Sequence, residues 1–200
     1  MEIFYLKKSE FFKSINRESL EYFSDNRKYT SDEKYLEHLS GLFLTKFIAK
    51  HFYKISDFKI ERRDNKPFFK NGGVFFSISH SKDIVLVAFN NENVGVDVEL
   101  IRNRSNYKAI MERFGEKIDN PTLEDFYKFW TLYESEIKLN SEKKSWFCSK
   151  MEDEYMLACV SDEPLISTFR VQKVVFCGEN IDLRDEFEAL EKCQFISSVE

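Results

Sequence analysis

The stretch "VFFSISHSKDIVLVAFNNENVGVDVEL", residues 74–100, decides the fold prediction. It contains three short apolar runs, VFFSIS, DIVLVAFN and VGVDVEL, and the polar segments between them have the composition of turns. Short apolar runs bounded by turn residues are typical of strands. We therefore expect a meander of three strands, with a Ser-His-Ser at the end of the first strand and an Asp-x-Glu in the third.

A long helix is expected before this meander. Thr30 and Glu33 stand at capping-box spacing, and apolar residues then recur at steps of three and four. These signals predict a helix over residues 31–53. Pro67 and the pair Gly72-Gly73 mark turns between this helix and the meander.

The region after the meander repeats the order of helix and strands. Thr122 and Asp125, at capping spacing, begin a second predicted helix. Segments 145–161 and 167–177 predict a hairpin and a further strand, and segment 184–193 a helical tail. The second helix is expected to carry an apolar stripe, Phe126, Phe129, Tyr133 and Ile137, and a neighbouring stripe that turns from aromatic to charged, Phe126, Trp130, Glu134 and Lys138.

The predicted fold class is α+β. We expect two similar α+β halves in a pseudo-twofold arrangement, each a helix packed on a small antiparallel sheet, with the functional site at their interface. The halves are residues 1–101 and 102–200. A chain of 200 residues with 42 % hydrophobic content and only three Pro can form a compact unit of this kind.

Charge and apolar patterning exclude several functional classes. The net charge of −5 argues against a general nucleic-acid binder. No stretch approaches the roughly 18 apolar residues of a spanning helix, and the N-terminus lacks the apolar run of a signal peptide. We therefore expect a cytoplasmic protein with neither nucleic acid nor membrane as partner. The four cysteines show no C-x-x-C pairing, which argues against a disulfide framework or a zinc site.

Three carboxylates are candidate metal ligands. Asp97 and Glu99 lie two apart in a predicted strand, so their side chains point the same way. Like charges so close raise each other's pKa unless a cation neutralises them. With Glu134 as a third oxygen donor, the pattern favours Mg²⁺, which typically joins carboxylates to phosphates. The alternative is a solvated strand face, with Glu134 and Lys138 as an ordinary surface pair on a helix.

His80 lies between Ser79 and Ser81, where a strand ends in a turn. Backbone N–H groups and hydroxyls at such a position can bind an anion. A Ser-His catalytic dyad is the alternative, but adjacent residues seldom present their side chains to each other, and no G-x-S-x-G elbow occurs in the sequence.

Three segments, FSISHS, VGVDVE and FWTLYESEIK, resemble in order and spacing the signature motifs of the Sfp-type 4′-phosphopantetheinyl transferases. Those motifs are F-N/S-x-S-H-S, G-x-D-x-E and W-x-x-K-E-S-x-x-K. The resemblance covers roughly residues 20–160. It implies a monomeric, Mg²⁺-dependent enzyme that transfers the phosphopantetheine arm of coenzyme A to a serine of an apo acyl or peptidyl carrier protein, releasing adenosine 3′,5′-bisphosphate.

The resemblance also implies roles for residues within the motifs. Asp97, Glu99 and Glu134 would hold the Mg²⁺ that bridges the coenzyme A pyrophosphate. Lys138 would face the same pyrophosphate and act with Glu134 in catalysis. Ser79 and His80 would contact the coenzyme A phosphates.

Four assignments lie outside the motifs. Arg27 and Lys28 match the family's basic N-terminal region and would contact the 3′-phosphate of coenzyme A, and Lys66 matches the lysine of a G-K-P element that also binds coenzyme A. Asp119 is nearest to the acidic residue that would activate the carrier serine in catalysis. Lys28 can equally be a solvated helix flank, and Asp119 a turn residue.

The sequence departs from the family at Tyr133, where the third motif has its first lysine. Lysine carries a charge and three donors, whereas tyrosine offers one neutral hydroxyl and an apolar ring. Either Lys138 and its neighbours suffice for transfer, or the chain is a degenerate member that binds coenzyme A or a carrier without transfer. A structural α+β protein with chance motifs is a third reading.

Carrier proteins are typically acidic, and this chain is also acidic, so bulk charge cannot bring the two together. Docking would need a local patch. The segment between residues 102 and 117, which has Arg102, Arg104, Lys108 and Arg113 amid apolar residues, is one candidate, and an ordinary amphipathic helix is the alternative reading.

Overall fold

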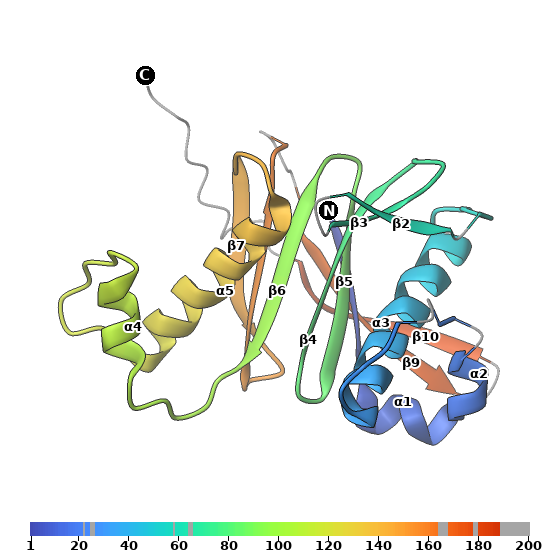
Figure 1. The fold of residues 1–200 in the computed structure, drawn as a ribbon, viewed down its shortest axis with the longest axis horizontal. Coiled ribbons are helices and arrows are strands. Elements are labelled where there is room, and N and C mark those ends of the chain that lie inside the picture. Colours follow the sequence, from blue (N-terminus) through green and yellow to red (C-terminus); the bar gives the residue numbers. More distant parts are fainter. Residues whose placement is uncertain are drawn as a thin grey trace.

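The computed structural model describes residues 1–21, 23, 24, 27–57, 59–63, 66–163, 168–177 and 180–188. Helices pack on small sheets in this part of the chain, and the expected α+β class is confirmed (Figure 1). No helix among these residues is long and apolar enough to cross a membrane.

The helices are α1 (Lys8–Ser14), α2 (Arg17–Glu21), α3 (Asp32–His51), α4 (Tyr107–Arg113) and α5 (Leu123–Leu139). The strands are β1 (Glu2–Lys7), β2 (Ile60–Arg63), β3 (Lys66–Phe69), β4 (Phe75–Ser81), β5 (Ile84–Asn90), β6 (Val94–Leu100), β7 (Ser145–Met151), β8 (Tyr155–Ser161), β9 (Arg170–Cys177) and β10 (Asn180–Glu188).

The strands form three sheets. The largest has the order β10-β9-β1-β5-β4, the second is the hairpin β2-β3, and the third has the order β6-β8-β7. Neighbouring strands are antiparallel except β1 and β9, which are parallel. Figure 1 shows α3 against the largest sheet and α5 against the three-stranded one, with β4 and β6 between them.

The expected three-strand meander is wrong in its third member. β4 and β5 form the predicted hairpin, but β6 pairs with β8 along its whole length, from Val94 opposite Ser161 to Leu100 opposite Tyr155. The reason is that β5 already has β1 on one edge and β4 on the other. β6 therefore lies outside the first sheet and forms an edge of the three-stranded sheet.

Two strand pairs join the segments before and after residue 101. β6 lies before this residue and pairs with β8, which lies after it, and β1 pairs in the same way with β9. The sheets therefore do not follow the division into residues 1–101 and 102–200, which stays a prediction about the chain.

Helix α3 occupies nearly the predicted range, with its N-cap one residue later than expected. The Ser31 hydroxyl accepts the backbone N–H of Lys34 at 3.3 Å, and the extended backbone of Ser31 makes it the cap in place of Thr30. Leu39, Leu44 and Ile48 are fully buried. They belong to the core cluster that joins this helix to β1 and β5.

Helix α5 begins at the predicted capping box. The Thr122 hydroxyl accepts the Asp125 N–H at 3.1 Å, and the Asp125 carboxylate accepts the Thr122 N–H at 2.9 Å. The predicted apolar stripe is right at Phe126, which is fully buried, and wrong at Ile137, which is 55 % exposed. The buried face consists of Phe126, Tyr127, Thr131, Ser135 and Leu139.

β6 approaches α5 very closely on this buried face, next to the small residue Ser135. A Cβ at Gly95 would lie 2.0 Å from the Ser135 carbonyl oxygen and 2.6 Å from the Leu139 nitrogen. The hydroxyls of Thr131 and Ser135 donate to carbonyls of their own helix, so both polar groups are satisfied where they are buried.

The predicted helical tail is wrong over residues 184–188. These residues lie in β10, which pairs antiparallel with β9, and Arg170 of β9 donates two hydrogen bonds of 3.0 Å to the Asp185 carboxylate. The free edge of β9 gives this segment a pairing partner that the local sequence pattern does not reveal. Residues 189–193 lie outside the described part of the chain.

Candidate functional site

A cavity of about 470 Å³ opens between α3, the β2-β3 hairpin, β4 and the last turn of α5. Its lining carries several basic side chains, among them Arg62, Lys66, His80 and Lys138. Glu37 is an acidic member of the same lining. A concave site whose charged side chains are mainly basic suits an anionic ligand.

Asp97 lies beside this cavity on β6. Its side chain is buried, and the residue is only 6 % exposed. One carboxylate oxygen, Oδ1, accepts the Ser79 hydroxyl and the Lys138 ammonium, each at 2.7 Å. The other oxygen, Oδ2, is buried and has no hydrogen-bond partner among the described residues. A buried carboxylate oxygen without a donor is a position that a cation can fill.

Glu99 and Glu134 lie close enough to Asp97 to feel its charge. Burial raises the pKa of Glu99 above its usual value, and the negative charge of Asp97 raises it further. The pKa of Glu134 is raised by the same two causes in the same order. The strand spacing of Asp97 and Glu99 thus has the predicted electrostatic effect, and Glu134 of α5 shares it.

Lys138 connects α5 to this carboxylate group. Besides its contact with Asp97, its ammonium donates to the Ser79 hydroxyl at 2.9 Å and to the Val96 carbonyl at 3.0 Å. The close approach of α5 at Gly95 brings the lysine within reach of β6. Lys138 therefore lies between the cavity, which it lines, and the three carboxylates.

The donor chemistry of this group fits a hard divalent cation. Three carboxylates supply oxygen ligands, as Mg²⁺ prefers, and one buried oxygen of Asp97 has no other partner. In the described part of the chain, no three His, Cys, Asp or Glu side chains are close enough to enclose a metal ion. The assignment of all three carboxylates to one metal therefore stays a prediction.

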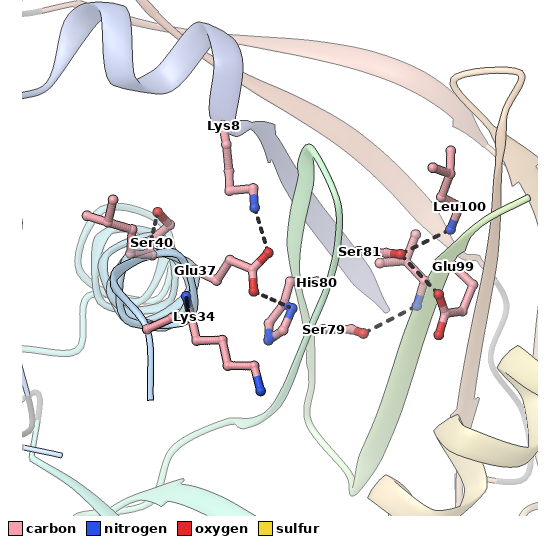
Figure 2. A network of polar contacts seen from close by, with 12 residues as sticks. Lys8, Lys34, Glu37, Ser40, Ser79, His80, Ser81, Glu99 and Leu100 are labelled. Atoms are coloured by element: carbon pink, nitrogen blue, oxygen red, sulfur yellow. Dashed lines mark hydrogen bonds and ion pairs between the residues drawn. The ribbon is translucent and has the colours of Figure 1, made fainter. Parts of the chain in front are cut away.

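His80 lines the cavity and projects from β4 toward Glu37 of α3, as Figure 2 shows. Its Nδ1 lies 3.6 Å from a carboxylate oxygen of Glu37, and the other oxygen of Glu37 accepts the Lys8 ammonium at 2.7 Å. Desolvation by the surrounding protein lowers the pKa of His80, and the positive charges of Lys138 and Lys8 lower it further against the opposing effect of Glu37. His80 is thus mainly neutral at pH 7, a hydrogen-bonding group rather than a fixed charge.

Lys66 lines the cavity, but its ammonium has structural partners. It donates to the carbonyls of Val94 at 2.9 Å and Leu139 at 3.0 Å, and to the side-chain oxygen of Asn93. Desolvation lowers the pKa of Lys66 to about 8. Because an ammonium has three donors, these contacts already use them, and they tie β3 to the start of β6 and the end of α5.

Comparison with known proteins adds an independent observation. The chain is 34 % identical over 116 residues to a Haemophilus influenzae protein named "Putative 4'-phosphopantetheinyl transferase". This similarity supports the 4′-phosphopantetheinyl transferase superfamily. The match covers 52 % of this chain, and the chain spans about half, 48 %, of the length of that relative. No family model matches the sequence.

Tyr133, the departure from the superfamily motif, does not point into the cavity. Its ring packs on Phe114 at 4.8 Å between centroids, with Phe129 and Trp130 each at 6.0 Å. Tyr133 is also absent from the residues that line the cavity. It lines instead a second hollow of about 420 Å³ on another side of α5. The substitution therefore leaves the Lys138 side of the helix unchanged.

The other superfamily assignments lie away from this cluster. Arg27 and Lys28 are exposed on the segment before α3, and neither is among the cavity lining. Asp119 is an exposed residue in a bend before α5. Within the described residues, no hydrogen bond or ion pair joins it to Asp97 or Glu99. All three assignments stay predictions.

Sequence reasoning missed several residues of this site, among them Arg62, Glu37 and Lys8. Glu37 contacts His80 from α3, and Lys8 contacts Glu37 from the start of α1. The pair is largely buried, with each side chain 13 % exposed. Neither residue stands in a motif, and the separation along the chain leaves no local signal for their contact.

Proposed function

We propose that this protein transfers the 4′-phosphopantetheine group of coenzyme A to a serine of an apo acyl or peptidyl carrier protein, releasing adenosine 3′,5′-bisphosphate. The observation that carries the proposal is the place of Lys138. It lines the basic cavity and also contacts the buried carboxylate of Asp97. A pyrophosphate in the cavity would therefore lie next to a group of oxygen ligands for Mg²⁺.

Asp97, Glu99 and Glu134 would hold the Mg²⁺. When bound there, the ion neutralises charge on the pyrophosphate under attack and on the departing phosphate. The raised pKa values of Glu99 and Glu134 indicate carboxylates that a cation stabilises in the ionised form.

The chain's own groups orient the substrate. Lys138 would place a positive charge against the pyrophosphate oxygens. A bound phosphate would favour the protonated form of His80, which would then donate one N–H to the phosphate and direct the Nδ1–H toward Glu37. In the transfer, the carrier serine oxygen bonds to the phosphorus that bears the pantetheine arm, and the bond from this phosphorus to the oxygen of the adenosine bisphosphate breaks. The serine proton would pass to water at the site, because Asp119, the acceptor expected from the sequence, lies away from this cluster.

A non-catalytic binding protein is the second candidate, because Tyr133 replaces a family lysine. The packing of Tyr133 on Phe114 and Phe129 favours the transferase. The replacement alters an aromatic cluster and leaves Lys138, His80 and Asp97 together at the cavity.

The test is a transfer assay with the full chain. The protein is incubated with coenzyme A, Mg²⁺ and each of several apo carrier proteins, and carriers are weighed by mass spectrometry. The proposal expects a carrier to gain the mass of one phosphopantetheine group, with loss of the product on chelation or in Asp97→Asn. Binding of coenzyme A by calorimetry, with no product on any carrier, would favour the second candidate.

A further inference from the structure

β4 and β6 are edge strands of different sheets, and serine side chains join them. The hydroxyls of β4 accept backbone N–H groups of β6 at three successive steps: Ser77 from Val96 at 3.1 Å, Ser79 from Val98 at 3.3 Å, and Ser81 from Leu100 at 3.1 Å. Both strands advance two residues at each step, so they run parallel and in register. We name these three contacts the serine ladder.

Two of these serines make a second contact. The Ser79 hydroxyl donates to Asp97 Oδ1 at 2.7 Å, and the Ser81 hydroxyl donates to Glu99 Oε2 at 3.0 Å, as Figure 2 shows for Ser81. A serine hydroxyl can accept and donate at the same time. Each of these two serines therefore holds the backbone of β6 and one of its carboxylates together.

Ser77 is the natural control within the ladder. Each ladder serine faces the β6 residue just before the N–H that it accepts: Asp97 for Ser79, Glu99 for Ser81 and Gly95 for Ser77. Glycine has no side chain to receive the Ser77 proton. Ser77 thus makes the same backbone contact as Ser81 without touching a carboxylate of the site.

We propose that Ser79 and Ser81 are positioning residues that orient the Asp97 and Glu99 carboxylates toward a shared divalent cation. The proposal rests on the metal site of the proposed function. A hydroxyl that donates to one carboxylate oxygen fixes the side-chain rotation and leaves the other oxygen for the cation. Partners that orient metal ligands in this way typically contribute about 10–100-fold to metal affinity.

The test measures Mn²⁺ binding to the full chain by electron paramagnetic resonance, without any transfer reaction. We expect Ser81→Ala to weaken Mn²⁺ binding about 10-fold or more, and Ser81→Thr, which keeps the hydroxyl, to restore it. Ser77→Ala should leave Mn²⁺ affinity unchanged. Ser81→Ala and Ser77→Ala should each lower the unfolding temperature by about 2–4 °C, because each removes one ladder contact.

Equal Mn²⁺ affinity in Ser81→Ala and the unaltered chain would overturn the proposal. Equal weakening in Ser77→Ala and Ser81→Ala would also overturn it, since the ladder would then act only through the fold. Should Ser81→Ala fail to fold, Ser79→Ala must weaken Mn²⁺ binding by the same order. A chain that binds Mn²⁺ in a Ser81-dependent manner but transfers nothing contradicts only the proposed activity. A chain that transfers, but whose Mn²⁺ affinity is insensitive to Ser81→Ala, contradicts only the positioning role.

Discussion

Gly95→Ala tests whether the close contact of β6 with α5 positions the site. The added Cβ would lie 2.0 Å from the Ser135 carbonyl oxygen and 2.6 Å from the Leu139 nitrogen. Carbon atoms pack best at roughly 3.5–4.0 Å from their neighbours, so the helix must move by about 1.5 Å to relieve the clash. Both partners are backbone atoms, which no side-chain rotation can displace.

The expected losses differ in size for stability and activity. Overpacking of this kind costs about 1–3 kcal/mol of unfolding free energy, and each kcal/mol lowers the melting temperature of a chain this long by about 2–4 °C. Because α5 carries Glu134 and Lys138, the same shift misplaces both groups. A misplacement of about 1 Å can reduce turnover roughly 100-fold.

The assay pairs thermal unfolding with carrier transfer, well below the melting temperature. Leu20→Ala is the control, because Leu20 is fully buried in α2 away from the site and its loss costs about 2–5 kcal/mol. Leu20→Ala should lose stability and keep its transfer rate, whereas Gly95→Ala should lose both. A Gly95→Ala protein with unaltered melting temperature and rate would refute the reasoning, as would equal effects on rate in the two variants.

Three further predictions follow from individual contacts. Thr122→Ala removes the capping box of α5 and should cost about 0.5–2 kcal/mol in denaturant unfolding, with Thr122→Ser recovering most of it; an unchanged midpoint would contradict the role of the cap. The raised pKa of Glu99 means that folding disfavours its ionised form, so the unaltered chain should lose stability as pH rises from 4.5 through that raised pKa. Glu99→Gln, which still accepts the Ser81 hydroxyl, should flatten this slope and melt higher at pH 7 in metal-free buffer, and an identical pH profile would contradict the raised pKa, which burial and then the charge of Asp97 cause. Tyr133→Lys removes ring contacts worth about 0.5–1.5 kcal/mol each and should lower the melting temperature without raising transfer. A gain of transfer would instead support the hypothesis that the chain is a degenerate member of the superfamily, which binds coenzyme A or a carrier without transfer.

The sequence predicted those parts of the site that depend on local spacing. Asp97 and Glu99 share a strand face, and Thr122 caps the helix that carries Lys138, because side-chain direction and capping depend only on a few neighbouring residues. The order of the three motifs also predicted that His80, Asp97 and Lys138 belong together, and the structure places them around one cavity edge.

The predictions that were wrong concern contacts between residues that are distant in sequence. β6 pairs with β8 because both edges of β5 are taken, and a periodicity of two cannot reveal which strand lies alongside. The prediction that the apolar stripe of α5 includes Ile137 was wrong for a similar reason. Gly95 lets the backbone of β6 reach the helix, so small residues such as Ser135 are buried, while Ile137 faces solvent.

The central claim is that the cavity and the carboxylates form a transferase site. Its most direct test is mass spectrometry of a panel of apo carrier proteins after incubation with the full chain, coenzyme A and Mg²⁺. The account predicts that at least one carrier gains a single phosphopantetheine group, and that Asp97→Asn abolishes this gain while the folded chain persists. Carriers that all keep their apo mass, at ample protein and with confirmed binding of coenzyme A, would contradict it.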